Sequence, residues 1–212
     1  MKKYELTDEK KNYLGVTLHR IRALIDFANV KAGDIGGWIE KEDNLSHVDN
    51  CWVYGNGKVY GNGIVYGNGI VCDNGIVYGN GIVCDNGKVH DNGIVCGNGK
   101  VCGNGIVCDN GMVRGNGIVC GNGKVRSYGK VCGNGMVSKP SDILITGPTG
   151  SRDDFTTFYK TVDGGIGVTC GCFTGTLDEF LEAVEKTHGN NKKFRSTYKK
   201  LADAAKRQIL GV

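Results

Sequence analysis

Cysteine and histidine side chains recur at a fixed spacing in the middle of the chain. Cys72, His90 and Cys108 lie eighteen residues apart, and thiolate with imidazole is a ligand set that zinc accepts. In a chain that coils with this period, the three side chains form a column with a spacing of about 4.8 Å, that of neighbouring strands. Such a flat ladder does not surround a metal ion tetrahedrally. We therefore expect no metal ion and no cofactor.

A second group of reactive side chains lies in a short span near the C-terminus. The loop Gly147–Arg152 could hold an anion through Arg152 and backbone N–H groups, although it lacks the Lys-Ser/Thr of a P-loop. A Cys–His pair is an alternative, but a histidine at a helix C-terminus is also simply favourable as a cation, and a purely structural cap is a further alternative. The candidate ligand- or partner-binding residues are Ser151, Arg152, Thr157, Cys170, Cys172 and His188. We expect no catalytic residue.

The residues that must position these groups form a six-residue repeat. Fifteen valines, from Val53 to Val137, follow one another at intervals of six. The slots on either side of valine accept Lys and Arg, which cannot face a dry core. Because strand side chains alternate between faces, the valine points inward. The following Asn-Gly pair favours a corner, since both residues tolerate positive φ.

This pattern predicts an all-β left-handed parallel β-helix of about six coils over residues 35–142. Residues 1–34 are expected to form an N-terminal β cap, with one or two strands within 14–27. Residues 143–212 are expected to form a small C-terminal α+β domain with strands at 143–146, 155–161 and 166–173 and two helices. Thr176 and Glu179 have the spacing of a capping box at the start of the first helix.

One face of the predicted solenoid carries a strip of apolar and thiol side chains. Exposed apolar strips of this size favour contact with another chain. We expect a homo-oligomer, either a trimer or a dimer, or a bound partner on this third face. The residues that form it are Ile64, Tyr66, Ile82, Cys84, Cys102, Ile118 and Cys120.

Charge and hydropathy restrict the possible partners. The formal net charge is only +4, so the composition does not favour a nucleic-acid partner bound by charge. No stretch is long and apolar enough to span a membrane, and residues 1–11 are charged and no apolar run follows them, unlike a secretory signal. We therefore expect a cytoplasmic protein whose ten cysteines are thiols.

The units VYGNGK to VCGNGM resemble the hexapeptide-repeat superfamily. That resemblance implies the β-helix fold and, for many members, acyl transfer from acyl-CoA by a histidine base in a cleft between subunits. Here the solenoid holds only His47 and His90, and no extruded loop interrupts the frame. Acyl transfer is therefore an alternative function at this stage and not the leading one.

The two ends of the chain resemble small phage and prophage proteins with GNA-type hexapeptides and a shared C-terminal module. The resemblance lies in GVTLHRIRALIDFANVKAGDIGGWIEKEDNLS and in GPTGSRDDFTTFYKTVDGGIGVTCGCFTGTLDEFLEAVEKTHG. Those proteins mostly carry Ala where this chain has Gly57, Gly63 and Gly69, and each Gly is expected to add an entropic cost of roughly 0.5–1 kcal/mol relative to Ala. The resemblance implies a phage origin and an architecture.

The leading hypothesis from sequence is therefore a non-catalytic, phage-derived binding protein. It would bind and inhibit a host factor, either a protein of antiviral defence or its small nucleotide signal. A structural or assembly protein of a phage particle is one alternative, and a hexapeptide-repeat acyltransferase is another.

Overall fold

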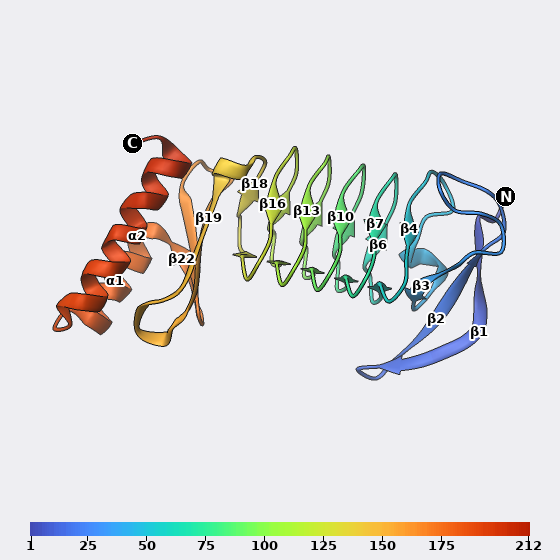
Figure 1. Cartoon of the computed structure of the whole chain (residues 1–212), viewed down its shortest axis with the longest axis horizontal. Helices are drawn as coiled ribbons and strands as arrows, with labels where there is room; N and C mark the ends of the chain where they lie inside the picture. The colour runs from blue at the N-terminus through green and yellow to red at the C-terminus, as the bar shows by residue number, and fades with distance from the viewer.

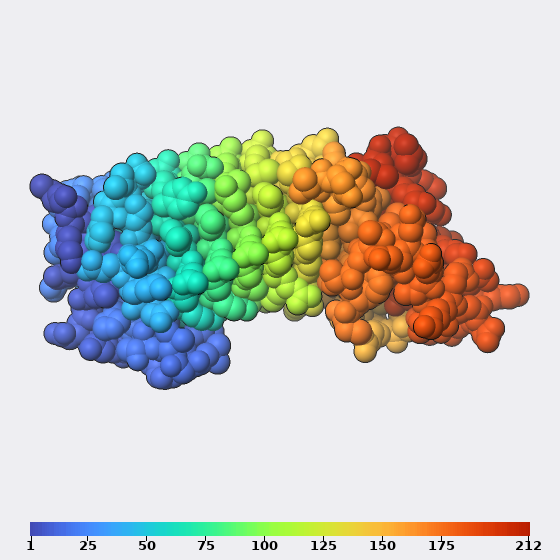
Figure 2. Space-filling model, turned by 180° about the vertical axis from the view of Figure 1, so that it is seen from behind, coloured from blue at the N-terminus to red at the C-terminus, as the bar shows by residue number.

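The molecule is a rod, with a hairpin at the N-terminal end and two helices at the other (Figure 1). The computed structural model describes residues 1–212. The predicted fold is confirmed as a parallel β-solenoid of about six coils with a small C-terminal α+β part. Viewed from the opposite side, the coils form a continuous rod and the N-terminal residues project to one side (Figure 2).

Each coil consists of three two-residue strands separated by corners. Strands three apart in the chain pair in parallel, in the orders β5-β8-β11-β14-β17, β4-β7-β10-β13-β16 and β6-β9-β12-β15-β18. The first of these sheets continues beyond β5 into the longer strand β3 (Ile35–Ile39), which also pairs in parallel. The strands are β4 (Trp52–Val53), β5 (Lys58–Val59), β6 (Ile64–Val65), β7 (Ile70–Val71), β8 (Ile76–Val77), β9 (Ile82–Val83), β10 (Lys88–Val89), β11 (Ile94–Val95), β12 (Lys100–Val101), β13 (Ile106–Val107), β14 (Met112–Val113), β15 (Ile118–Val119), β16 (Lys124–Val125), β17 (Lys130–Val131) and β18 (Met136–Val137).

The repeated valine fills the interior of every coil. All fifteen, from Val53 to Val137, are fully buried. Backbone hydrogen bonds run from coil to coil with the same register, as from Ile94 N to Gly111 O and from Cys96 N to Val113 O, each 2.9 Å long. Each coil therefore satisfies the backbone of its neighbour, which is what a buried strand requires.

The glycine before each strand lies too close to the next coil for a larger residue. A Cβ built on Gly57 would lie 2.9 Å from Val71 O, and one on Gly93 would lie 2.5 Å from Val107 O. From the sequence alone, glycine at this position is expected to be less favourable than alanine. The structure corrects that estimate, because in this backbone alanine would force neighbouring coils apart.

The N-terminal cap is a long hairpin of β1 (Tyr4–Tyr13) and β2 (Val16–Ala23), followed by β3 (Ile35–Ile39) and the short 3-10 helix η1 (Glu42–Asn44). The charged start of the chain was not expected to form a strand, so the prediction missed β1. Tyr4 is the reason that it forms, since this ring is fully buried and packs edge-on against Trp52, 6.1 Å away. The hairpin thus closes the open end of the valine core.

The C-terminal part has a four-stranded antiparallel sheet and two helices. Its elements are η2 (Pro140–Asp142), β19 (Ile143–Thr149), η3 (Gly150–Arg152), β20 (Asp154–Lys160), β21 (Ile166–Cys170), β22 (Phe173–Thr176), α1 (Leu177–His188) and α2 (Lys192–Leu210). The single strand predicted over 166–173 is wrong, because Gly171 turns the chain with a φ of 58°. The capping box is confirmed: Thr176 Oγ1 accepts from Glu179 N at 3.2 Å. Neither helix has the length and apolar character of a membrane span.

Asp142 ties the last coil to the C-terminal sheet. Its buried carboxylate accepts hydrogen bonds from Ser138 N at 2.9 Å, Ser138 Oγ at 2.7 Å and Lys139 N at 3.0 Å. Thr157 of β20 adds a second tie, because its Oγ1 accepts from Lys130 N at 3.1 Å. All three bonds to Asp142 end on Oδ2, whereas Oδ1 is buried without a hydrogen-bond partner, so the pairing at this joint is incomplete.

Replacing a core valine tests the inward orientation of the repeat. We expect Val95→Ala to lower the free energy of unfolding by roughly 2 kcal/mol or more, because it leaves a cavity in a close-packed stack. Ile94→Ala, at the neighbouring outward position, should cost under about 1 kcal/mol. Urea unfolding of both variants measures the difference; equal losses would contradict the assigned faces.

Acid should weaken the joint at Asp142. Burial raises the pKa of this carboxyl, but the hydrogen bonds from Ser138 and Lys139 outweigh burial and the net shift is downward. Because its pKa is lower in the folded state than in the unfolded state, the ionised carboxylate stabilises the fold at pH values above the unfolded-state pKa. This stabilisation is lost as pH falls below about 4. Urea unfolding measured from about pH 6 to about pH 2 follows this loss of stability, and Asp142→Asn should make it smaller. Asp8→Asn, at an exposed position, is the control and should leave the slope unchanged.

Candidate functional site

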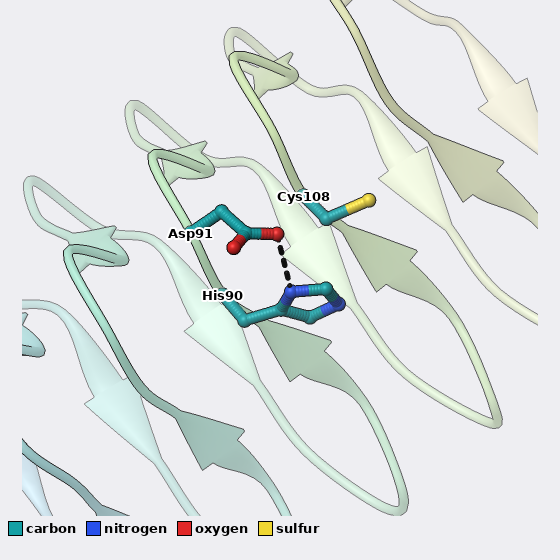
Figure 3. Close-up of side chains that lie close together, drawn as sticks. All are labelled: His90, Asp91 and Cys108. Atoms are coloured by element: carbon teal, nitrogen blue, oxygen red, sulfur yellow. Dashed lines mark hydrogen bonds and ion pairs between the residues drawn. The ribbon is translucent and has the colours of Figure 1, made fainter.

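The best-defined group of reactive side chains lies on the sheet that contains β7, β10 and β13. His90 directly follows β10, and Cys108 directly follows β13 in the next coil. The two strands pair in register, with Val89 opposite Val107. The column predicted from the eighteen-residue spacing is therefore present in the structure, and Figure 3 shows His90, Asp91 and Cys108 close together.

His90 is paired with the carboxylate that follows it in the chain. Its Nδ1 lies 2.8 Å from Asp91 Oδ2, and about one-third of the histidine side chain is exposed. With the proton on Nδ1, the ring donates to Asp91 and leaves Nε2 as an acceptor. Asp91 occupies the corner with a φ of 52°, a conformation that Asp tolerates better than most residues.

The carboxylate of Asp91 differs from those of the other corner aspartates. Asp85 Oδ2 accepts from Gly103 N at 3.0 Å, and Asp109 Oδ2 accepts from Ser127 N at 3.0 Å. Asp73 Oδ2 lies 3.5 Å from Asp91 N in the same arrangement and also accepts from Cys72 Sγ at 3.2 Å. Asp91 instead turns back to His90. Its orientation is therefore set by the histidine and not by the following coil.

The thiol of Cys108 completes the cluster. Its Sγ, one His90 ring nitrogen and an Asp91 oxygen all lie within 4.8 Å of one another. Burial, followed by Asp109 and Asp91, raises the pKa of Cys108. Burial and the hydrogen bond to Asp73 raise the pKa of Cys72, on the preceding coil, to about 12. Both thiols are therefore protonated at neutral pH in the free protein.

Sequence reasoning placed His90 and Cys108 in one column but did not select them as site residues, and it missed Asp91. The column pattern relates only outward strand side chains that stack eighteen residues apart, and Asp91 at the corner is not one of them. An acidic residue immediately after the single histidine of that column was the available signal, because the corner brings the two side chains together. The other solenoid histidine, His47, is a packing residue: its ring stacks on Tyr4 with the centroids 4.2 Å apart.

The candidate residues of the C-terminal part divide into separate contacts. Ser151 Oγ lies 3.2 Å from His188 Nε2 and 3.4 Å from Tyr198 OH. The His188 ring also stacks on Tyr198, with centroids 5.6 Å apart. Ser151 and His188 thus meet, but the histidine has no carboxylate partner. Tyr198, which the sequence analysis did not select as a site residue, holds the pair in place.

The remaining candidates do not join that pair. Arg152 Nη1 donates to Cys172 Sγ at 3.4 Å, and Cys170 Sγ accepts from Thr156 Oγ1 at 3.1 Å. Thr157 is buried in the joint with the solenoid, so its hydroxyl does not face a ligand. A cavity of about 590 Å³ between the last coil and β21–β22 is lined by other residues, including Cys132, Tyr159 and Lys206.

The third face predicted as a contact surface is only partly open. Ile64 and Tyr66 are 40% and 39% exposed, whereas Cys84 is 2% exposed. A hydrogen bond with Cys84 and burial raise the pKa of Tyr66 to about 12. Cys84 is therefore closed off from a partner by its own chain. Partly exposed side chains continue the strip at Ile82, Cys102, Ile118 and Cys120.

Comparison with known proteins gives one partial relationship. No protein-family model matches the chain. A stretch of 62 residues is 39% identical to the uncharacterized acetyltransferase YdcK of Escherichia coli K12. The match covers 26% of this chain and 19% of that protein.

This relationship corrects the expectation that the chain is not an enzyme. The similar protein is named as an acetyltransferase, so the comparison points toward catalysis, whereas the phage-derived inhibitor receives no support from it. What the repeat and the partial match support together is a hexapeptide-repeat β-helix.

Proposed function

We propose that this protein transfers an acyl group from a thioester donor to an amine or hydroxyl, with His90 as the general base. The observation that carries the proposal is the 2.8 Å contact between His90 Nδ1 and Asp91 Oδ2 on the open solenoid face. The partial similarity to a protein named as an acetyltransferase supports the same reaction class.

The His90–Asp91 pair has the arrangement of proton donor and acceptor that such a base needs. Asp91 fixes the ring and stabilises the imidazolium that forms when Nε2 accepts a proton. The acceptor loses its proton to Nε2 as its nitrogen or oxygen attacks the thioester carbonyl. The new C–N or C–O bond forms, the C–S bond breaks, and the leaving thiolate takes up the proton.

A second copy of the chain would complete the site. His90 lies on the outside of a sheet, and its side chain is about one-third exposed. A flat face offers few contacts to hold a donor, whereas small-molecule sites are generally concave. We propose a dimer or trimer in which the cleft lies between two solenoids.

Light scattering should give a mass of two or three chains, and a single-chain mass would contradict this arrangement.

Substituting the two candidate bases tests the reaction. With acetyl-CoA and a panel of amines and alcohols, His90→Ala should lower kcat/KM by about 100-fold or more, the scale of general-base catalysis. His188→Ala is the matched control, because this histidine contacts Ser151 and Tyr198 in the C-terminal part and not the His90–Asp91 pair. It should leave the rate unchanged.

The outcomes separate the possible sites. Loss of turnover in His188→Ala alone would move the reaction to the C-terminal part and overturn the role of His90. Turnover that survives both substitutions, or its absence in the unaltered protein across the panel, would overturn acyl transfer by this site.

Binding of a host factor is a second candidate function, and exposure of Ile64 and Tyr66 on the third face favours it. In a pull-down from a host lysate, Tyr66→Lys should remove a specific partner that Tyr128→Lys retains, since Tyr128 is exposed elsewhere on the rod. A captured protein that is indifferent to both substitutions would contradict binding through this face. The presence of the chain in purified phage particles would favour the structural alternative.

A further inference from the structure

The geometry points to a second capacity of the same surface: we propose that His90, Asp91 and Cys108 bind one Zn²⁺ ion. One ring nitrogen, one carboxylate oxygen and one sulfur lie within 4.8 Å of one another. Nitrogen, oxygen and thiolate sulfur are the three donor types that zinc takes, at about 2.0–2.3 Å. Side-chain rotations would have to bring the three donors from this separation to contact with one ion.

The corner residue removes the objection raised by the sequence. A column of outward side chains alone is flat and does not enclose an ion. Asp91 lies at the corner of the coil that carries His90, and Cys108 lies on the next coil (Figure 3). The three donors therefore come from two coils and project to the same side, and a water molecule would supply a fourth ligand, as in open zinc sites.

The orientation of Asp91 sets it apart from the neighbouring corner aspartates Asp85 and Asp109. The carboxylates of Asp85 and Asp109 are held by the backbone of the following coil. That of Asp91 is not, and it faces the cluster through His90. An oxygen donor is thus available where the nitrogen and sulfur converge, without breaking a bond between coils.

The surrounding charges are mixed in sign. Asp73 and Asp109 occupy the corners of the coils on either side of Asp91, and both favour a cation. Lys88, Lys124 and Arg126 project from the same sheet. When zinc binds, the Cys108 thiol releases its proton to solvent as the metal–sulfur bond forms, so the three protein ligands supply two negative charges.

Zinc binding and base catalysis exclude one another at this site. An imidazole that coordinates the ion has lost the lone pair or the carboxylate contact on which the base depends. If the proposed function holds, Zn²⁺ would inhibit acyl transfer. The metal site itself does not rest on that function, because its test measures binding and not turnover.

Cobalt absorption tests the site directly. Reduced, metal-free protein is titrated with Co²⁺, followed by Zn²⁺. We expect one equivalent of Co²⁺ to give the visible bands of four-coordinate cobalt and a thiolate charge-transfer band, which Zn²⁺ then removes. Cys108→Ser and His90→Gln should each weaken binding more than about 100-fold, since even outer-shell partners contribute roughly 10–100-fold.

Cys102→Ser is the matched control, because Cys102 occupies the same slot on another face and is also partly buried. It should retain the full spectrum. Asp91→Asn is a fourth variant. Asparagine fits the same corner conformation of the backbone, and this substitution should weaken metal binding. Circular dichroism shows whether each variant is folded. Bands that persist in Cys108→Ser, bands that disappear in Cys102→Ser, or no cobalt bands in the unaltered protein would overturn the site.

Discussion

The structure depends on the hydrogen bonding of each coil to the next over a core of stacked valines. Every Val from Val53 to Val137 is fully buried, and each strand pairs in register with the strand eighteen residues away. Burial of the valines orders the stack, while the backbone bonds prevent any slip. A one-residue shift would place lysines such as Lys88 and Lys100 inside, so the register is strongly specified.

This constraint determines what chemistry the rod can hold. Within the repeated coils, side chains meet along a column, across eighteen residues, or at a corner between neighbours in sequence. His90 and Asp91 use the corner, and Cys108 uses the column. The resulting cluster has an imidazole, a carboxylate that orients the imidazole, and a thiol. Acyl transfer needs the first two in the metal-free state, and a zinc ion would use all three, which makes the two states of the cluster alternatives.

The regular part of this architecture could be predicted from the sequence, and the irregular part could not. The period placed Val, His90 and Cys108 correctly because one rule repeats in every coil. Strand β1 was missed because its formation depends on Tyr4 packing against Trp52 from a distant segment. The turn of Asp91 toward His90 and the contact of Ser151 with His188 depend on side-chain rotamers. Periodicity carries no information about either.

The tautomer of the His90 ring is the most direct test of the proposed His90–Asp91 pair. A long-range ¹H–¹⁵N correlation spectrum of the metal-free protein reports which nitrogen of His90 carries the proton. The account predicts a proton on Nδ1, shared with Asp91, and a free Nε2; Asp91→Asn should shift this balance, whereas Asp109→Asn should not. A neutral His90 protonated on Nε2, with no response to Asp91→Asn, would contradict the pair on which both the proposed base and the zinc site depend.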